Sequence, residues 1–541
     1  MVRNLRRQIG PVFWISVALS AAFVVWGASS PASLGNTFDT VLDYVISSFG
    51  WVYLLAVTGF LLFVGFLAFS RYGKIRLGRD SDRPEFSTIS WISMLFAAGV
   101  GLSFLFWGVG EPASHLGTTP YGMVEPNTPA AAETSMQYTF FHWGLHPWAV
   151  YAVVAMAIAY FGFRKGGGNL ISATLRPLFG DRVDGGFGKT VDILAIVAVL
   201  FGVATALGLG ALQLNGGLTY VFGEGAVPNG FTTQLIIISV LTVAYLISAA
   251  TGVDKGILIL SLINMVIALC LMLFVLFAGP TVFLVETFTK SIGTYLGNIV
   301  PMSFQTPVFE AEGAWAEGWT LFYWAWWVSW APFVGTFIAR ISKGRTIKEF
   351  VLGVIFAPTI LSFVWFTIFG GTAIYLDLFE GGNIAETAAT DLPTALFDTL
   401  SSLPLGAVVS IVAIILVSIF FVTSADSATF VLGSMSTNGS ENPAPAVKLT
   451  WGLIIALFAS VLLYAGGLNA LQTATITAAV PFSIVMICIC ISLMKSLREE
   501  FEYAGEPGSR EPEESEARET AEAPSGGAAS QPTAAAPRRG K

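Results

Sequence analysis

Apolar residues occur along this chain in long runs, which shorter polar segments separate. A helix needs about 20 mostly apolar residues to cross the hydrocarbon of a bilayer. By that rule the chain contains twelve such runs: 11–29, 51–69, 91–110, 138–160, 190–215, 232–249, 257–278, 317–339, 350–370, 407–432, 449–466 and 471–494. The pattern predicts an all-α polytopic membrane protein with twelve transmembrane helices.

Two segments differ from these runs. Residues 281–300 alternate apolar side chains with Glu286, Lys290 and Asn298, which predicts an amphipathic helix on the outer membrane surface. Residues 498–541 are rich in Glu, Pro, Ala, Ser and Gly, a composition that cannot form a core. We therefore expect a disordered, acidic cytoplasmic tail there.

The basic residues predict the orientation. If the twelve runs alternate across a membrane, 26 of the 27 Lys and Arg residues fall on one side, and only Lys290 falls on the other. Basic residues gather on the cytoplasmic side, so both termini are expected to be cytoplasmic, with residues 1–10 as the N-terminal segment. The run 11–29 is longer than the apolar part of a signal peptide, and we interpret it as a retained first helix of a multi-pass cell-membrane protein.

Composition narrows the function classes. The chain is 54 % hydrophobic and only 11 % charged, with a mean hydropathy of +0.72, values that fit a protein surrounded by lipid. Three cysteines inside apolar runs offer neither a disulfide framework nor a metal cluster, and three histidines are too few for most metal chemistry. A net charge of −8 makes nucleic acid an unlikely partner.

The run 317–339 holds the densest aromatic cluster. At about 100° per residue, one helix face carries five of its rings, those of Trp319, Tyr323, Trp326, Trp327 and Trp330. An interfacial aromatic belt or plain core packing would also use such residues. Indoles near the middle of a span favour an aromatic cage for a quaternary ammonium cation.

The run 138–160 adds Trp143, Trp148 and Tyr151. It also places His142 and His146 four residues apart, the spacing of two zinc ligands. A proton relay is a second possible role for ionisable groups at membrane depth. We favour a third interpretation, a packed pair with satisfied hydrogen bonds.

Two further spans carry polar features. Gly99 and Gly101 indicate either close helix packing or an unwound stretch that exposes backbone groups to a substrate or an ion. Thr423 and Ser424 near the end of run 407–432 supply hydroxyl oxygens, which suit a hard cation, although hydroxyls also bond to their own helix.

With these motifs, the chain resembles the betaine/carnitine/choline transporter family, called BCCT. The segments that carry the resemblance are 94–112, 141–151, 319–350 and 420–433, and the most specific is Tyr-Trp-Ala-Trp-Trp-Val-Ser-Trp-Ala-Pro-Phe at 323–333. The resemblance implies two N-terminal helices in 11–90 and a LeuT-like core of two inverted five-helix repeats in 91–497. It also implies a homotrimer.

The resemblance assigns site residues as well. The trimethylammonium group of the substrate would lie in a box of Trp326, Trp327 and Trp330, with Trp324 nearby. Trp143, Trp148 and Tyr151 would complete the pathway and its outer gate. The carboxylate end would meet unwound backbone at Ala98, Gly99 and Gly101.

No cofactor is implied beyond a coupling ion, which is expected to be Na⁺. One family site for sodium corresponds here to Ala97, Val100, Phe420, Thr423 and Ser424. A second site would include Phe333, but the matching positions in run 190–215 are Val199 and Val203, which have no side-chain oxygen. The second site is therefore doubtful in this chain.

Ser103 bears on the substrate, because choline carriers of the family tend to have Asp there. A neutral Ser favours a zwitterion, so the expected function is osmoprotective import of glycine betaine by Na⁺ symport. The alternatives are proton-coupled uptake of choline or betaine, and carnitine-type exchange. An ion channel or a membrane-embedded enzyme fits less well, since the sequence offers neither a filter loop nor a catalytic constellation.

Overall fold

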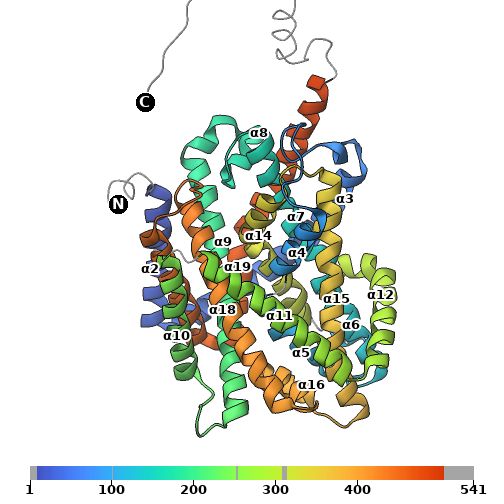
Figure 1. Cartoon of the computed structure of the whole chain (residues 1–541). Coiled ribbons are helices and arrows are strands. Elements are labelled where there is room, and N and C mark those ends of the chain that lie inside the picture. Colours follow the sequence, from blue (N-terminus) through green and yellow to red (C-terminus); the bar gives the residue numbers. More distant parts are fainter. Residues whose placement is uncertain (1–8, 100, 252–253, 307–312, 505–541) are drawn as a thin grey trace, which may run out of the picture. The chain divides into compact units, whose positions relative to one another are not determined.

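The structure is a computed structural model, and it describes residues 9–99, 101–251, 254–306 and 313–504 (Figure 1). Almost all of these residues are helical, and the β structure among them amounts to one isolated bridge between Arg76 and Thr346. Nine of the described helices are long and apolar enough to cross a membrane. The prediction of an all-α polytopic membrane protein is therefore confirmed at the level of fold class.

The long helices follow one another with short connections. Their bounds are α2 Pro11–Ser29, α3 Pro31–Phe69, α4 Thr88–Gly99, α5 Leu102–Gly117, α6 Pro129–Trp143, α7 Leu145–Ala159, α9 Gly186–Phe222, α10 Phe231–Thr251, α11 Asp254–Ala278, α12 Thr281–Ser303, α14 Phe322–Ile341, α15 Ile347–Phe379, α18 Gly406–Ser436 and α19 Pro445–Ala504. Shorter helices connect them, namely α8 Arg176–Phe179, α13 Gly313–Ala316, α16 Ile384–Thr390 and α17 Ala395–Ser401.

Each of the twelve apolar runs coincides with helical structure. The last two runs both lie in α19, where Gly466 and Gly467 leave the helical conformation, with φ of 175° and 60°. The nine long apolar helices count α6 and α7 together as one, count α19 once, and omit α4, α5, α12 and α14. Twelve spans, the inverted repeat and the domain limits stay predictions.

Two boundaries differ from the sequence expectation. The outer loop expected before the second span is helical, because α3 begins at Pro31 and extends over 39 residues. The amphipathic segment is a helix, α12, that extends to Ser303. Among the described residues, those up to Leu493 form one compact unit, and the final turns of α19 from Met494 onward belong to a second.

Two interruptions shape the centre of the first unit. Gly101, just before α5, is extended, with φ −136° and ψ −170°, so the third apolar run is divided into α4 and α5. Gly144 divides the fourth run into α6 and α7, with φ −93° and ψ −132°. A Cβ on Gly144 would lie only 2.4 Å from the carbonyl oxygen of Phe140, so a residue with a side chain could not adopt this break without a shift.

The core surrounds α7 and α14, which pack along each other. Every residue of α7 after Leu145 is buried, although this helix begins directly after the interruption at Gly144. Gly335 of α14 permits this approach, because a Cβ there would lie 2.8 Å from Val154 Cγ1. In contrast, α10 and α12 lie at opposite edges of the view in Figure 1 and expose many apolar side chains, as helices facing lipid do.

Candidate functional site

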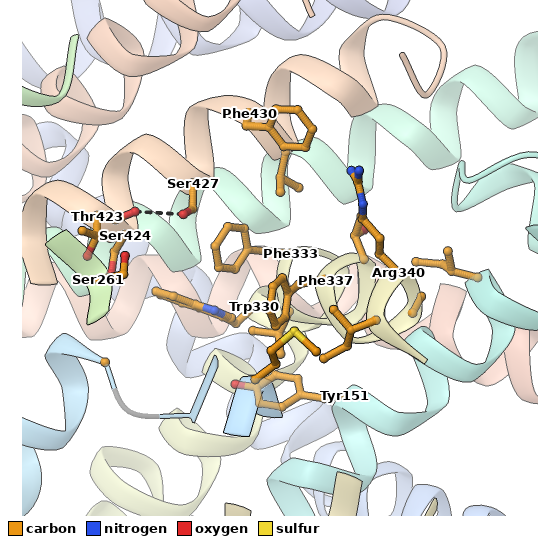
Figure 2. Close-up of a pocket in the computed structure, with 18 of the residues that line it drawn as sticks. Tyr151, Ser261, Trp330, Phe333, Phe337, Arg340, Thr423, Ser424, Ser427 and Phe430 are labelled. Atoms are coloured by element: carbon orange, nitrogen blue, oxygen red, sulfur yellow. Dashed lines mark hydrogen bonds between the residues drawn. The ribbon is translucent and has the colours of Figure 1, made fainter. Parts of the chain in front are cut away.

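A cavity of about 1070 Å³ extends between α5, α7, α11, α14 and α18 (Figure 2). Its lining includes Trp143 of α6 as well as Arg340, Glu441 and Lys448. The latter residues lie in segments that the charge pattern assigns to the cytoplasmic side. The cavity is large enough for a small organic solute.

One wall of the cavity is aromatic. Trp148, Tyr151, Trp327 and Trp330 line it together with Trp143. The ring of Trp148 lies 5.5 Å from that of Tyr151, whose ring in turn lies 6.2 Å from that of Trp327, both edge to face. Residues from α6, α7 and α14 therefore converge on one cavity, and their predicted role in substrate binding stays a prediction.

Trp326 and Trp324, the other two predicted cage residues, lie behind this wall. Trp326 is fully buried, stacks on Trp327 with the ring planes 10° apart, and donates Nε1–H to the carbonyl oxygen of Gly202. Trp324 stacks on His146 at 5.4 Å. Neither side chain lines the cavity. Trp326 supports the ring of Trp327, whose own Nε1 is held 3.1 Å from the carbonyl oxygen of His142.

The glycine-softened segment reaches the same cavity. Gly101 and Ser103 line it at the beginning of α5. Val100 lies outside the described residues, and the side chains of Ala97 and Ala98 are likewise not described, nor are the surroundings of Gly99. The backbone break between α4 and α5 agrees with the expected unwinding.

Oxygen-bearing side chains from α18 line a second part of the wall. Phe420, Thr423 and Ser424 face the cavity, as does Phe333 of α14, and Figure 2 shows the hydroxyls near the ring of Trp330. Thr423 donates its hydroxyl proton to the carbonyl oxygen of Ile419 at 3.0 Å, which leaves oxygen lone pairs for a cation. Ser427 donates to the carbonyl oxygen of Thr423 at 2.9 Å.

At the doubtful second sodium site, the two matching positions of α9 have no side-chain oxygen. Val199 and Val203 are buried there. Thr205 has a hydroxyl on the same helix, but it bonds to Leu471 and Thr475 of α19, at 3.1 and 2.6 Å. Its oxygen is therefore engaged away from α14.

The sequence pattern did not indicate that α11 forms part of the cavity wall. Ser261 and Asn264 line the cavity, and the amide group of Asn264 is buried with no hydrogen-bond partner among the described residues. A polar amide inside the apolar run 257–278 is the signal that could have identified it, since buried amides normally have partners.

Glu111 is a correction. The predicted third run ends at residue 110 and leaves Glu111 outside the span, but α5 continues to Gly117 and Glu111 is fully buried. Its Oε2 accepts hydrogen bonds from Trp143 Nε1 and the Tyr323 hydroxyl, both at 2.6 Å, and its Oε1 lies 2.7 Å from His142 Nδ1. This carboxylate joins α5, α6 and α14 directly behind the aromatic wall.

The two histidines of the fourth run do not act as a pair. His142 bonds Glu111 and Thr320, whereas His146 bonds Ser303 at 3.0 Å and stacks on Trp324. Both are fully buried. The favoured expectation of a packed pair with satisfied hydrogen bonds holds only in part, because the two histidines have different partners and His146 Nδ1 has none among the described residues.

An interrupted helix beside an aromatic cavity, within a bundle of long apolar helices, defines a class of membrane proteins that carry solutes. Consistent with this, the family model described as "BCCT, betaine/carnitine/choline family transporter" matches residues 11–502. The chain belongs to this family, so it is a transporter rather than an enzyme and resides in the cell membrane as a multi-pass protein.

Named relatives resemble the chain over nearly its whole length. It is 52 % identical to the glycine betaine transporter OpuD of Bacillus subtilis over 91 % of this chain and 95 % of that protein. It is 44 % identical to a probable glycine betaine transporter of Desulfitobacterium hafniense, over 92 % and 99 % of the two chains. It is also 44 % identical to an ectoine/hydroxyectoine transporter of Virgibacillus pantothenticus, over 90 % and 96 %.

Proposed function

We propose that this chain imports glycine betaine by Na⁺ symport. The observation that carries the proposal is one cavity with the rings of Trp327, Trp330 and Tyr151 on one part of its wall and the hydroxyls of Thr423 and Ser424 on another. Two relatives that cover nearly the whole chain are named as certain or probable glycine betaine transporters.

The aromatic wall suits a quaternary ammonium group. Such a cation has no proton to donate, so hydrogen-bond acceptors do not select it, whereas the negative faces of indole and phenol rings do. Ser103 on the cavity wall carries no charge. A zwitterion, which brings its own carboxylate, therefore fits this site better than choline does.

The coupling ion is assigned to the α18 hydroxyls. Hard cations prefer oxygen ligands, and Thr423 and Ser424 line the same cavity as Gly101, which lies between α4 and α5 with an extended backbone. Because α9 presents Val199 and Val203, we assign a single ion to this chain.

The charge pattern supports the proposed orientation, and the family supports the proposed oligomeric state. Residues assigned to the cytoplasmic side, including Arg340, Glu441 and Lys448, line part of the cavity, so we assign an inward-facing conformation, with both termini in the cytoplasm. Three copies in the membrane form the transporter, which protects the cell against osmotic stress.

Uptake by the purified protein in proteoliposomes tests the substrate. Radiolabelled glycine betaine should enter with saturation, and unlabelled betaine should compete more strongly than choline or carnitine. Non-saturable flux would contradict a carrier, and stronger competition by choline would contradict the preference for zwitterions.

Ectoine is a second candidate substrate, favoured by the 44 % identity to an ectoine/hydroxyectoine transporter. Ectoine is also a zwitterion, but its positive charge is delocalised over a ring that carries N–H donors. Competition by ectoine that exceeds competition by betaine would transfer the assignment to ectoine.

A further inference from the structure

Three buried side chains converge on the far side of Trp143 from the cavity. They are Glu111 and His115 of α5 and His142 of α6, and one ligand atom from each lies within 4.8 Å of the others. All three residues have no exposed surface. The cluster has no part in the proposed contacts with substrate or sodium.

His115 is the unexplained member of this cluster. Neither of its ring nitrogens has a hydrogen-bond partner among the described residues. The nearest charged atom is Glu111 Oε1, 3.3 Å from His115 Nε2, without the geometry of a hydrogen bond. Aromatic rings enclose the imidazole, with Trp319 at 4.4 Å and Trp315 at 5.1 Å. An imidazole without hydrogen bonds is costly to bury in such a place, and an occupant between His115 and Glu111 would provide a partner for Nε2.

The donor set indicates which occupant fits. Two imidazole nitrogens and one carboxylate oxygen are the ligands of zinc and of similar divalent transition metals, whereas sodium and calcium prefer oxygen alone. Zinc binds such atoms at about 2.0–2.2 Å, so small side-chain rotations would bring the three donors to one ion.

The surroundings would orient these ligands. Glu111 Oε2 is held by Trp143 Nε1 and the Tyr323 hydroxyl, which leaves Oε1 directed at both histidines. His142 Nε2 lies 2.9 Å from Thr320 Oγ1, so Nδ1 is the nitrogen that faces Glu111. Metal-binding histidines usually have this kind of partner on the second ring nitrogen.

We propose that Glu111, His115 and His142 form a binding site for a divalent transition metal such as Zn²⁺. The ion would connect α5 to α6 beside Trp143 and would hold these two helices together. Because the side chains are shielded from solvent, binding is slow and follows opening of the site.

Metal titration of the purified full-length protein, prepared without a histidine tag, tests this proposal. The chain has only three histidines, so background binding is low. We expect one Zn²⁺ per chain by calorimetry, and visible absorption bands of a tetrahedral or five-coordinate site when Co²⁺ replaces zinc. His115→Phe should weaken binding at least about tenfold, since one of three protein ligands is lost.

His146→Asn is the matched control, because His146 is equally buried but bonds Ser303 outside the cluster. This variant should bind zinc as the wild type does. Absence of stoichiometric binding in the wild type, which needs no variant to fold, would overturn the proposal. Unchanged binding in His115→Phe, or equal loss in His146→Asn, would also overturn it. If a proton on His115 is the occupant instead of a metal ion, the wild-type protein will bind no metal.

Discussion

Trp330 lines the cavity and is the partly exposed indole of α14, whereas the other indoles of this helix are buried. Replacement by Ala removes a cation–π contact that is worth about 2 kcal/mol when desolvated. We expect Trp330→Ala to weaken glycine betaine binding about 30-fold. Equilibrium binding to the purified protein measures this effect.

Trp14→Ala is the control for that measurement, because Trp14 is 61 % exposed on α2 and lies away from the cavity. Its binding constant should equal that of the wild type. If the two variants lose affinity equally, the α14 tryptophans stabilise the fold rather than bind the substrate.

Substitution of Ser103 tests whether the charge at this position selects the substrate. A carboxylate in Ser103→Asp would attract a net cation and repel the carboxylate of betaine. We expect the ratio of choline to betaine uptake to rise by about tenfold, which corresponds to about 1.4 kcal/mol. Asn has the size of Asp but no charge, so Ser103→Asn should keep the wild-type ratio. An unchanged ratio in Ser103→Asp would refute the argument from charge.

At the residue scale, sequence periodicity located the aromatic wall but did not decide which indoles face the cavity. Trp326 and Trp327 are adjacent, yet Trp327 lines the cavity whereas Trp326 bonds Gly202 of α9. That choice depends on where α9 packs, which a single helical pattern does not contain. Glu111 was misplaced for a related reason, since α5 continues past the end of the apolar run.

At the scale of elements, α18 presents the proposed sodium ligands. Thr423→Ala removes one hydroxyl from a small oxygen site, so the sodium concentration for half-maximal uptake should rise about tenfold, a loss of about 1.4 kcal/mol. The half-saturating betaine concentration at saturating sodium should change much less. Uptake assays at varied sodium and betaine concentrations separate the two constants.

Ser418→Ala is the matched change on the same helix. Ser418 bonds its own helix at Ile414 and does not line the cavity. Its sodium dependence should match that of the wild type. A shift in Ser418→Ala as large as that in Thr423→Ala would indicate a general effect on α18.

The contact between α7 and α14 positions Tyr151 against Trp327. Gly335→Val would force side-chain atoms into Val154 and the backbone of Ala155, an overpacking that costs about 1–3 kcal/mol. We expect a lower midpoint in thermal unfolding of the detergent-solubilised protein. Gly65→Val in α3, where a Cβ meets nothing within 4 Å, should change the midpoint little.

The sequence located every long helix of the bundle, because long apolar runs leave few alternatives in a membrane. It did not predict that helix α3 starts at Pro31 or that the fourth run breaks at Gly144. The break at Gly144 depends on close contacts with Phe140 and Tyr295, which a hydropathy pattern does not record.

For the whole molecule, we propose that one cavity binds the substrate together with one coupled ion. The aromatic wall, the broken third span and the α18 hydroxyls meet at the same cavity, so substrate and sodium should bind in a single coupled event. With Val199 and Val203 in α9, no second oxygen site is assigned.

The sodium dependence of glycine betaine uptake in proteoliposomes, with the proton gradient collapsed, tests this account most directly. The account predicts no concentrative uptake without sodium and a hyperbolic dependence on external sodium, as one ion per substrate requires. Full uptake without sodium that follows an imposed proton gradient would contradict it.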